Sequence, residues 1–358
     1  TGTHVAQALW AYLKFYNHKE PKNNKGEWIG KVYANSYKEI ETNPDFKKEV
    51  SDILQRLENN DKQILALWKK TREWSLDEFK KIYKILGAKF DIWFFDHELI
   101  QPTRKIIKRL KQKNIIKESY GALVADLERY GLHTAIILKQ DGTIPYLSKD
   151  LALALKKFKE YKIAKSIYVV DVRQTLHFQQ LFKILELYGF KQAKNCYHLN
   201  YEMVDLLTGA MASRKGNVIL FKDFYQDTLE LAKKETRRRH KEWAEKQIES
   251  GSEKISLAAI KFEMINADNN RKILFDQKKV LSFEGETGPY IQYAHARISS
   301  ILRKTKKINK INVGGLTTQE EIKLVKLLSD YPKKIQEAAT QYNPSVISNY
   351  LFDLAQSF

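Results

Sequence analysis

The strongest constraint on the fold of this chain is a repeated transition from strand to helix along its middle third. From Phe90 onward, short runs rich in β-branched and aromatic residues alternate with stretches of helical periodicity. Such alternation is typical of a parallel or mixed sheet with helices packed on it. The sequence therefore predicts an α/β core.

Three blocks of this region place polar side chains where a strand or turn leads into a helix or loop. They are Asp141–Phe158, Tyr168–Leu181 and Gly209–Val218. Open α/β sheets bind ligands there, beyond the carboxyl ends of their strands. The third block is a small-residue loop in which Arg214 and Lys215 are adjacent, a pair suited to gripping phosphate. Together the blocks predict an enzyme that uses a nucleotide.

Periodicity predicts the individual elements. Strands are expected near residues 90–95, 121–127, 134–139, 166–171, 201–207 and 218–221, with helices between them over 103–113, 150–161 and 177–187. Helices are also expected over 4–16 and through most of 36–90, where Ser75 and Glu78 have capping-box spacing at the start of a separate helix. A long basic helix over Asp223–Ile248 is expected to end at Gly251-Ser252.

Everything after that break is predicted to be helical. Thr318 and Glu321 have capping-box spacing, and Asn343-Pro344 places a capping residue before a first-turn proline. The chain thus divides into an α/β part followed by a helical part.

Charge bears on the kind of partner. Lys plus Arg number 62 against 43 Asp plus Glu, a formal net charge of +19. Such an excess attracts polyanions, most simply nucleic acid. Solvated lysine-rich faces with no partner explain the composition equally well, so composition alone leaves both interpretations open.

Other classes are disfavoured. No apolar run approaches the roughly 20 residues that a membrane span needs, and no signal sequence opens the chain. The single cysteine, Cys196, allows no internal disulfide, and no Cys/His spacing is suited to zinc. A cytoplasmic protein is expected. Both ends fall inside apolar helical patterns, so we expect a piece of a longer protein.

With two further blocks, Ala258–Asp276 and Ser282–Lys304, the sequence resembles the arginyl-tRNA synthetases, which belong to class I. The resemblance implies a Rossmann-like catalytic domain over residues 1–250, with a helical insertion over about 36–90, and part of an α-helical anticodon-binding domain over 251–358. It implies ligation of L-arginine to tRNA(Arg) through an arginyl-adenylate, with ATP and Mg²⁺, by a monomer.

The resemblance also implies an arginine pocket. Tyr146, Asp150 and Gln174 match positions that bind arginine in the family, and Asp96 stands where the family usually has Glu. Carboxylates hold a guanidinium through paired, charge-assisted hydrogen bonds, and an aromatic wall suits its flat face. The alternative for Asp150 is a carboxylate that caps the start of a helix.

The ATP site is implied by the third block. It aligns with the family's second signature, Lys-Met-Ser-Lys-Ser, but reads Ala-Met-Ala-Ser-Arg here. The resemblance gives catalytic roles to Ser213, Arg214 and Lys215, which would stabilise charge on the ATP phosphates, and ATP contacts to Met211, Ser213, Lys215 and His177. A surface turn is the alternative for the loop, and a core or capping histidine is the alternative for His177.

The remaining predictions concern RNA and the rival functions. Tyrosines with bases suit stacking and phosphate contact, and the expected tRNA-binding residues are Arg237, Arg238, Tyr290, Tyr293, Arg297, Arg303 and Lys304. Tyrosines packed in a helical core are the alternative there. The first signature, His-x-Gly-His, is absent, so this piece alone is expected to be inactive. The rival functions are a non-catalytic tRNA-binding paralogue and a class I synthetase for another cationic amino acid.

Overall fold

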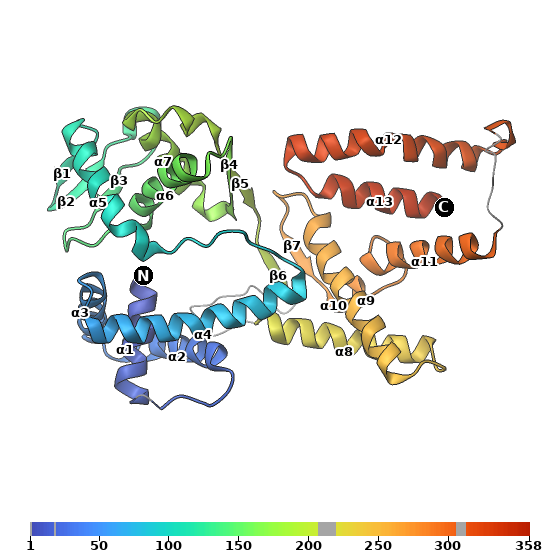
Figure 1. The fold of residues 1–358 in the computed structure, drawn as a ribbon, viewed down its shortest axis with the longest axis horizontal. Helices are drawn as coiled ribbons and strands as arrows, with labels where there is room; N and C mark the ends of the chain where they lie inside the picture. Colours follow the sequence, from blue (N-terminus) through green and yellow to red (C-terminus); the bar gives the residue numbers. More distant parts are fainter. Residues whose placement is uncertain (1, 18, 207–219, 306–312) are drawn as a thin grey trace. The chain divides into compact units, whose positions relative to one another are not determined.

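The computed structural model describes residues 2–17, 19–206, 220–305 and 313–358. The described chain forms two compact units, one of residues up to Leu199 and one from Asn200 onward (Figure 1). The predicted change from an α/β part to a helical part is confirmed. The predicted boundary near residue 250 between catalytic and anticodon-binding domains stays a prediction.

Unit one opens with a bundle of helices. These are α1 (Thr3–Tyr16), α2 (Lys25–Thr42), α3 (Phe46–Glu58) and α4 (Lys62–Leu86). Their apolar faces bury Leu9, Tyr12, Val32 and Leu57 in one core. The helical character of 36–90 is thereby confirmed.

The capping box predicted at Ser75 is wrong. Helix α4 runs unbroken through that position, and Ser75 Oγ donates to the Thr71 carbonyl 3.2 Å away within the helix. The cap lies earlier, where Asp61 accepts from the backbone N–H groups of Gln63 and Ile64. The apolar face of α4 continues through residues 67–74, and its burial keeps the helix intact despite the capping-box spacing of Ser75 and Glu78.

The α/β part of unit one follows. Its elements are α5 (Asp96–Gln112), β1 (Lys117–Ser119), β2 (Ala122–Ala125), β3 (Ala135–Leu138), α6 (Tyr146–Tyr161), β4 (Ser166–Asp171), α7 (Thr175–Tyr188) and β5 (Cys196–Tyr201), with short 3₁₀ turns at Glu128–Tyr130, Val172–Gln174 and Lys191–Asn195. β1, β2 and β3 form an antiparallel sheet, with Lys117 opposite Val124, and β4 pairs with β5. One core joins α5, α6 and α7 to these strands.

The strand predicted over 90–95 is wrong. This segment is a loop between α4 and α5 in which Phe90 and Trp93 are exposed and pack on Tyr83 of α4, with ring centroids 4.7 and 5.9 Å from that tyrosine. Its aromatic composition serves this cluster instead of a sheet.

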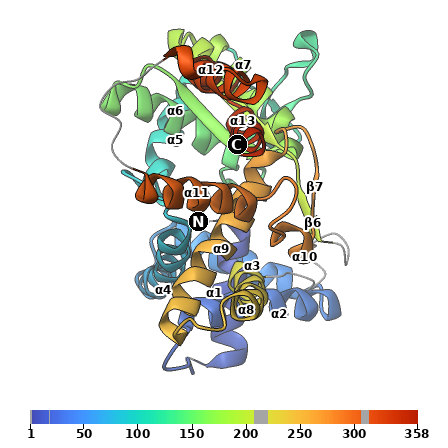
Figure 2. The ribbon, with the colours of Figure 1, turned by 90° about the vertical axis from the view of Figure 1, so that its right-hand side faces the viewer.

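Unit two contains one parallel strand pair, β6 (Val204–Leu206) with β7 (Ile273–Phe275), and is otherwise helical as far as the structure describes it. The prediction that everything after Gly251-Ser252 is helical is therefore wrong at β7. Its helices are α8 (Phe221–Arg239), α9 (Glu245–Asn266), α10 (Gln277–Val280), α11 (Gly288–Lys304), α12 (Gln319–Gln341) and α13 (Ser345–Ser357), with a 3₁₀ turn at Val313–Gly315. α8 and α9 pack on each other, as do α12 and α13 (Figures 1 and 2). Strand 218–221 is not confirmed, because Phe221 already begins α8 and the preceding residues lie outside the described ones up to 219.

The break predicted at Gly251-Ser252 lies elsewhere. α8 ends at Arg239, the turn spans 240–244, and Gly251 and Ser252 lie inside α9. Their small size serves packing, because Ser252 Oγ lies 3.2 Å from Thr236 Oγ1 of α8 and a Cβ at Gly251 would lie 3.1 Å from the Trp243 ring. The later capping box is confirmed, because Thr318 and Glu321 form it. The cap predicted at Asn343 lies one residue later: α13 begins at Ser345 with Pro344 as its N-cap, and Asn343 Oδ1 accepts from the Ser345 N–H.

Candidate functional site

Helix α6 gathers the side chains from which the site is built. Tyr146, Lys149 and Asp150 stand at positions i, i+3 and i+4, so they share one face of the helix. The helix begins at Tyr146 after Pro145, which ends the turn that follows β3. Asp150 lies beyond the first turn, which contains no acidic residue, so the capping alternative for Asp150 does not hold.

Asp96 approaches this face from α5. It is the first residue of that helix, and its carboxylate lies 3.5 Å from the ammonium of Lys149. The Lys149 side chain is only 4% exposed, whereas that of Asp96 is 35% exposed. The Lys149 ammonium also lies 5.5 Å from the centre of the Tyr146 ring. One buried cation therefore joins two of the predicted arginine-binding residues.

The hydroxyl of Tyr146 has a partner in the helical bundle. It lies 2.9 Å from Nε2 of His4 on α1, and the two rings are stacked. Burial lowers the pKa of His4, and burial together with Asp96 raises the pKa of Tyr146. A neutral imidazole next to a protonated phenol lets the hydroxyl donate to His4, which fixes the orientation of the tyrosine ring.

Asp150 and His177 contact each other. His177 Nε2 on α7 lies 2.8 Å from Asp150 Oδ2, and both side chains are about three-quarters buried. Gln174 ends the 3₁₀ turn before α7, is exposed, and hydrogen-bonds the Asp171 carboxylate. The structure thus brings a residue predicted for arginine, Asp150, together with one predicted for ATP, His177.

Residues predicted in the second-signature loop fall outside the described part of the chain. These are Met211, Ser213, Arg214 and Lys215. Their predicted roles in catalysis and ATP binding stay predictions.

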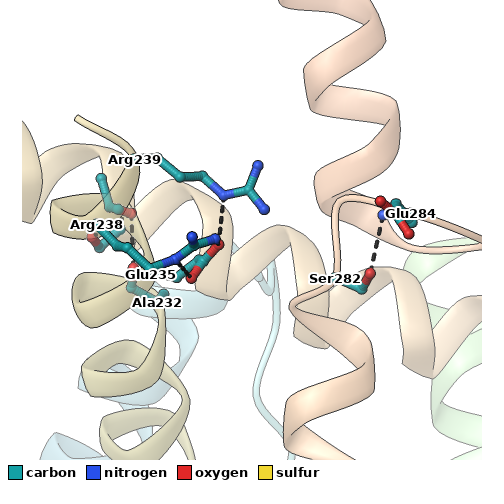
Figure 3. A network of polar contacts seen from close by, with 8 residues as sticks. Ala232, Glu235, Arg238, Arg239, Ser282 and Glu284 are labelled. Atoms are coloured by element: carbon teal, nitrogen blue, oxygen red, sulfur yellow. Dashed lines mark hydrogen bonds and ion pairs between the residues drawn. The ribbon is translucent and has the colours of Figure 1, made fainter.

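The arginine run at the end of α8 is engaged in intramolecular ion pairs. Arg238 and Arg239 both hydrogen-bond Glu235, one turn earlier (Figure 3), and Arg237 pairs with Glu245 at the start of α9. All three arginine side chains are about half exposed or more. Exposed pairs of this kind contribute little to stability, so a phosphate can replace the carboxylate at small cost.

Helix α11 contains the other predicted RNA-binding residues. Tyr290, Tyr293, Arg297, Arg303 and Lys304 all lie on it, as the sequence predicted. Tyr290 is half-buried against Phe352 of α13, with centroids 5.5 Å apart, so core packing accounts for this residue. Tyr293 is 50% exposed, and the Arg297 guanidinium lies 5.8 Å from its ring centre. Tyr293 and Arg297 together offer an exposed cation–π surface.

Sequence reasoning missed Lys149 and His4. Lys149 carried a usable signal, because it shares a helix face with Tyr146 and Asp150. His4 carried none, because 142 residues separate it from Tyr146 and only the fold brings them together.

Two negative findings apply to the described residues only. Within them, no helix has the length and apolar character needed to cross a bilayer. No three His, Cys, Asp or Glu side chains of that part cluster as metal ligands would.

Similarity to known proteins covers the whole chain. Residues 7–277 match the family model of the tRNA synthetases class I (R), catalytic domain, and residues 291–358 match the DALR anticodon binding domain. The arginine–tRNA ligase of Bdellovibrio bacteriovorus is 40% identical over 367 residues, covering 100% of this chain and 63% of that protein. The arginine–tRNA ligase of Clostridium botulinum is 34% identical over 358 residues, with the same coverage.

Solved structures agree with these sequence matches. The arginyl-tRNA synthetase of Thermus thermophilus superposes with a TM-score of 0.84 at 25% identity, over 99% of this chain and 65% of that one. The Plasmodium falciparum enzyme shares the fold, with a TM-score of 0.78 at 23% identity. The chain spans 63% of the length of the curated relatives that it matches.

Proposed function

The chain belongs to the class I arginyl-tRNA synthetases, and from that premise we propose that the whole protein attaches L-arginine to tRNA(Arg) through an arginyl-adenylate. Membership of the family confirms the predicted fold class, a class I catalytic core followed by a helical anticodon-binding part. We propose residues 1–250 for the catalytic part and 251–358 for the anticodon-binding part.

The shared face of α6 is the observation that most supports arginine as the substrate. Asp150 and Tyr146 lie on that face, and Asp96 reaches it through Lys149. Asp96 pairs with the buried Lys149 ammonium, and Asp150 adds a second carboxylate on the same helix face, which suits a guanidinium. The tyrosine ring supplies a flat wall on which the planar cation stacks.

The proposed reaction has two steps. The arginine carboxylate attacks the α-phosphorus of ATP and pyrophosphate leaves, after which a hydroxyl of the terminal adenosine of tRNA displaces AMP. No covalent bond to the protein forms, so catalysis consists of positioning and charge stabilisation. We propose Ser213, Arg214 and Lys215 for the phosphates, with Met211 and His177 as further ATP contacts and Gln174 for the backbone of arginine.

Mg²⁺ enters this scheme with ATP. Magnesium is usually held by substrate phosphates with one or two carboxylates, not by a dedicated protein cage. A cytoplasmic monomer remains part of the proposal.

The test uses the full reading frame, of which this chain is a part. We expect labelled arginine, but not lysine or glutamine, to be attached to a tRNA pool with ATP. Asp150→Ala should raise the KM for arginine about tenfold to a hundredfold, the effect of losing a charged hydrogen bond, with little change in the KM for ATP. Asp126→Asn is the control, because Asp126 is an exposed residue paired with Lys117 at the surface.

Other outcomes decide between the rivals. An intact protein that binds tRNA but charges no amino acid would be the non-catalytic paralogue. Charging with lysine would identify a synthetase for another cationic amino acid. An equal rise in both KM values for Asp150→Ala would remove Asp150 from the arginine pocket.

A further inference from the structure

The start of helix α5, which carries Asp96, has no side-chain cap. Its N-cap residue is Phe95, and phenylalanine has no side-chain oxygen to accept from the first backbone N–H groups of a helix. Asp96 is the first residue of α5, and its carboxylate is one of the groups proposed for arginine. The position of that carboxylate therefore depends on what holds the residues on either side of it.

Both neighbours of Asp96 pack on helix α4. On one side, the ring centre of Phe95 lies 4.6 Å from the central carbon of the Arg72 guanidinium. On the other side, the rings of His97 and Trp68 meet edge to face, with centroids 4.7 Å apart. The loop that follows α4 runs back along that helix, as Figure 1 shows, and meets it again at these two contacts.

Arg72 lies at the centre of this cluster. It stands four residues after Trp68 on α4, so the two side chains share one helix face. The central carbon of its guanidinium lies 4.5 Å from the centre of the Trp68 ring, which brings the planar cation within cation–π distance of both Trp68 and Phe95. Trp68 is 4% exposed and belongs to the core of the helical bundle. Arg72 thus connects a rigid core residue of α4 to the start of α5.

Ring contacts, not hydrogen bonds, set the position of this cluster. Arg72 Nε and His97 Nδ1 are both buried, and neither has a hydrogen-bond partner among the described residues. Burial lowers the pKa of His97, and the Arg72 guanidinium acts in the same direction, so the imidazole is neutral next to the cation. Buried polar atoms without partners cost free energy, and such exceptions call for an explanation other than stability.

We propose that Arg72 is a positioning residue for arginine binding: its two ring contacts fix the start of α5 and with it the reach of the Asp96 carboxylate toward α6. Aspartate has a short side chain, so the place of its carboxylate follows closely from the place of its backbone. A binding group of this kind needs a supporting residue that is itself locked by packing. The inference deepens the proposed function and rests on it, because it takes arginine as the substrate that Asp96 contacts.

The experiment is a double-mutant cycle on the full-length protein, with charging kinetics as the readout. Arg72→Met keeps the aliphatic stem and removes the guanidinium. A displacement of about 1 Å can cost up to about a hundredfold, so we expect the KM for arginine to rise about tenfold, with little change in kcat or in the KM for ATP. In a protein that already carries Asp96→Asn, Arg72→Met should raise the KM for arginine by less than about twofold, because the group that Arg72 positions is gone.

Two results would overturn the proposal. One is a rise in the KM for arginine that is as large with Asp96→Asn as without it, since Arg72 would then not act through Asp96. The other is an equal rise in the KM for ATP. Arg129→Met is the matched control: Arg129 is exposed in the same unit, and its guanidinium lies 4.8 Å from the Tyr130 ring, so the change removes a cation–π contact outside the site and should leave both KM values unchanged.

A second variant covers the case in which Arg72→Met does not fold. Arg72→Lys retains the charge but loses the flat group that stacks on the rings, so the KM for arginine should rise by a smaller factor, about threefold. This rise should again disappear in the Asp96→Asn protein. A rise of the same size in both backgrounds would overturn the proposal for this variant too.

The two proposals fail separately. A wild type that charges arginine, but in which the effects of Arg72→Met and Asp96→Asn multiply, leaves the enzyme intact and refutes the role of Arg72. A wild type that charges no arginine refutes both.

Discussion

At the scale of single residues, Lys149 is the buried cation that pairs with the Asp96 carboxylate in the candidate site. A lysine that is 4% exposed has left nearly all of its hydration behind, and the Asp96 carboxylate 3.5 Å away compensates for that loss. Asp96 is thereby drawn to the same helix face as Asp150. We propose that Lys149 positions the Asp96 carboxylate and does not itself contact arginine.

Replacing Lys149 separates this role from general packing. We expect Lys149→Met to lower the free energy of unfolding by about 2–4 kcal/mol, because it leaves a carboxylate without its buried partner, and to raise the KM for arginine without raising that for ATP. Lys149→Arg retains the cation and should restore most of both properties. Urea unfolding and charging kinetics measure the two effects. A normal KM for arginine in Lys149→Met would contradict the positioning role.

Glu235 carries the pH dependence of the α8 arginine cluster. Arg238, with Arg239 beside it, lowers the pKa of the Glu235 carboxyl from 4.5 to about 2. A carboxyl group whose pKa is lower in the folded state than in the unfolded state stabilises the fold at pH values above its unfolded-state pKa. This stabilisation is lost as the pH falls through its folded-state pKa. The stabilisation should be complete above about pH 4.5 and lost toward pH 2.

The measurement is the melting temperature of wild type and Glu235→Gln between pH 7 and pH 2.5. The variant should melt lower at pH 7, by a small amount because the pair is partly exposed, and the difference should shrink below pH 4.5. In a protein that already carries Arg238→Met, Glu235→Gln should lower the melting temperature by less. A difference that stays constant with pH would argue against this origin.

At the scale of elements, we expect substitution by alanine to have opposite effects on stability at two glycines. Gly288, at the start of α11, packs directly on α9: a Cβ there would lie 2.3 Å from the Ala258 carbonyl oxygen. Gly30 lies inside α2 and is exposed, and a Cβ added there would meet no atom within 4 Å. One glycine is required by a close helix approach and the other is not.

Gly288→Ala should therefore destabilise unit two by about 1–3 kcal/mol, the usual cost of overpacking. Gly30→Ala should stabilise the chain by roughly 0.5–1 kcal/mol, because alanine is the better helix former. Urea unfolding followed by circular dichroism measures both. If Gly288→Ala is neutral, α9 and α11 are not as closely packed as described.

The same scale shows what periodicity could and could not predict. It located the strands over 121–127, 134–139 and 166–171 and the helices that follow, because each has its own apolar pattern. It failed at Ser75, Gly251 and the 90–95 loop, where the deciding contacts come from residues on other elements: the bundle core around α4, Trp243 on Gly251, and Tyr83 under Phe90. For the site, helix spacing alone places Tyr146 and Asp150 on one face, whereas the approach of His4 and Asp96 depends on tertiary packing.

At the scale of the whole molecule, the net charge of +19 left two explanations open: a surface for RNA, or lysine-rich faces with no partner. The structure allows them to be separated, because the arginine run on α8 is held by acidic residues that can be removed one at a time. Glu235→Gln and Glu160→Gln each raise the net charge by one. The first releases Arg238 and Arg239, and the second releases Lys156 on α6.

If overall charge alone drew RNA to the protein, the two substitutions would strengthen tRNA binding equally. If α8 contacts the phosphate backbone, only Glu235→Gln should do so, and its plot of log Kd against log salt should steepen by about one to two units, since each added phosphate contact releases close to one counterion. Titrations of tRNA between low and moderate salt measure the slope. Equal slopes for both variants would mean that the arginine run at the end of α8 does not contact RNA. Tyr293 and Arg297 of α11 would then be the proposed RNA contacts in unit two.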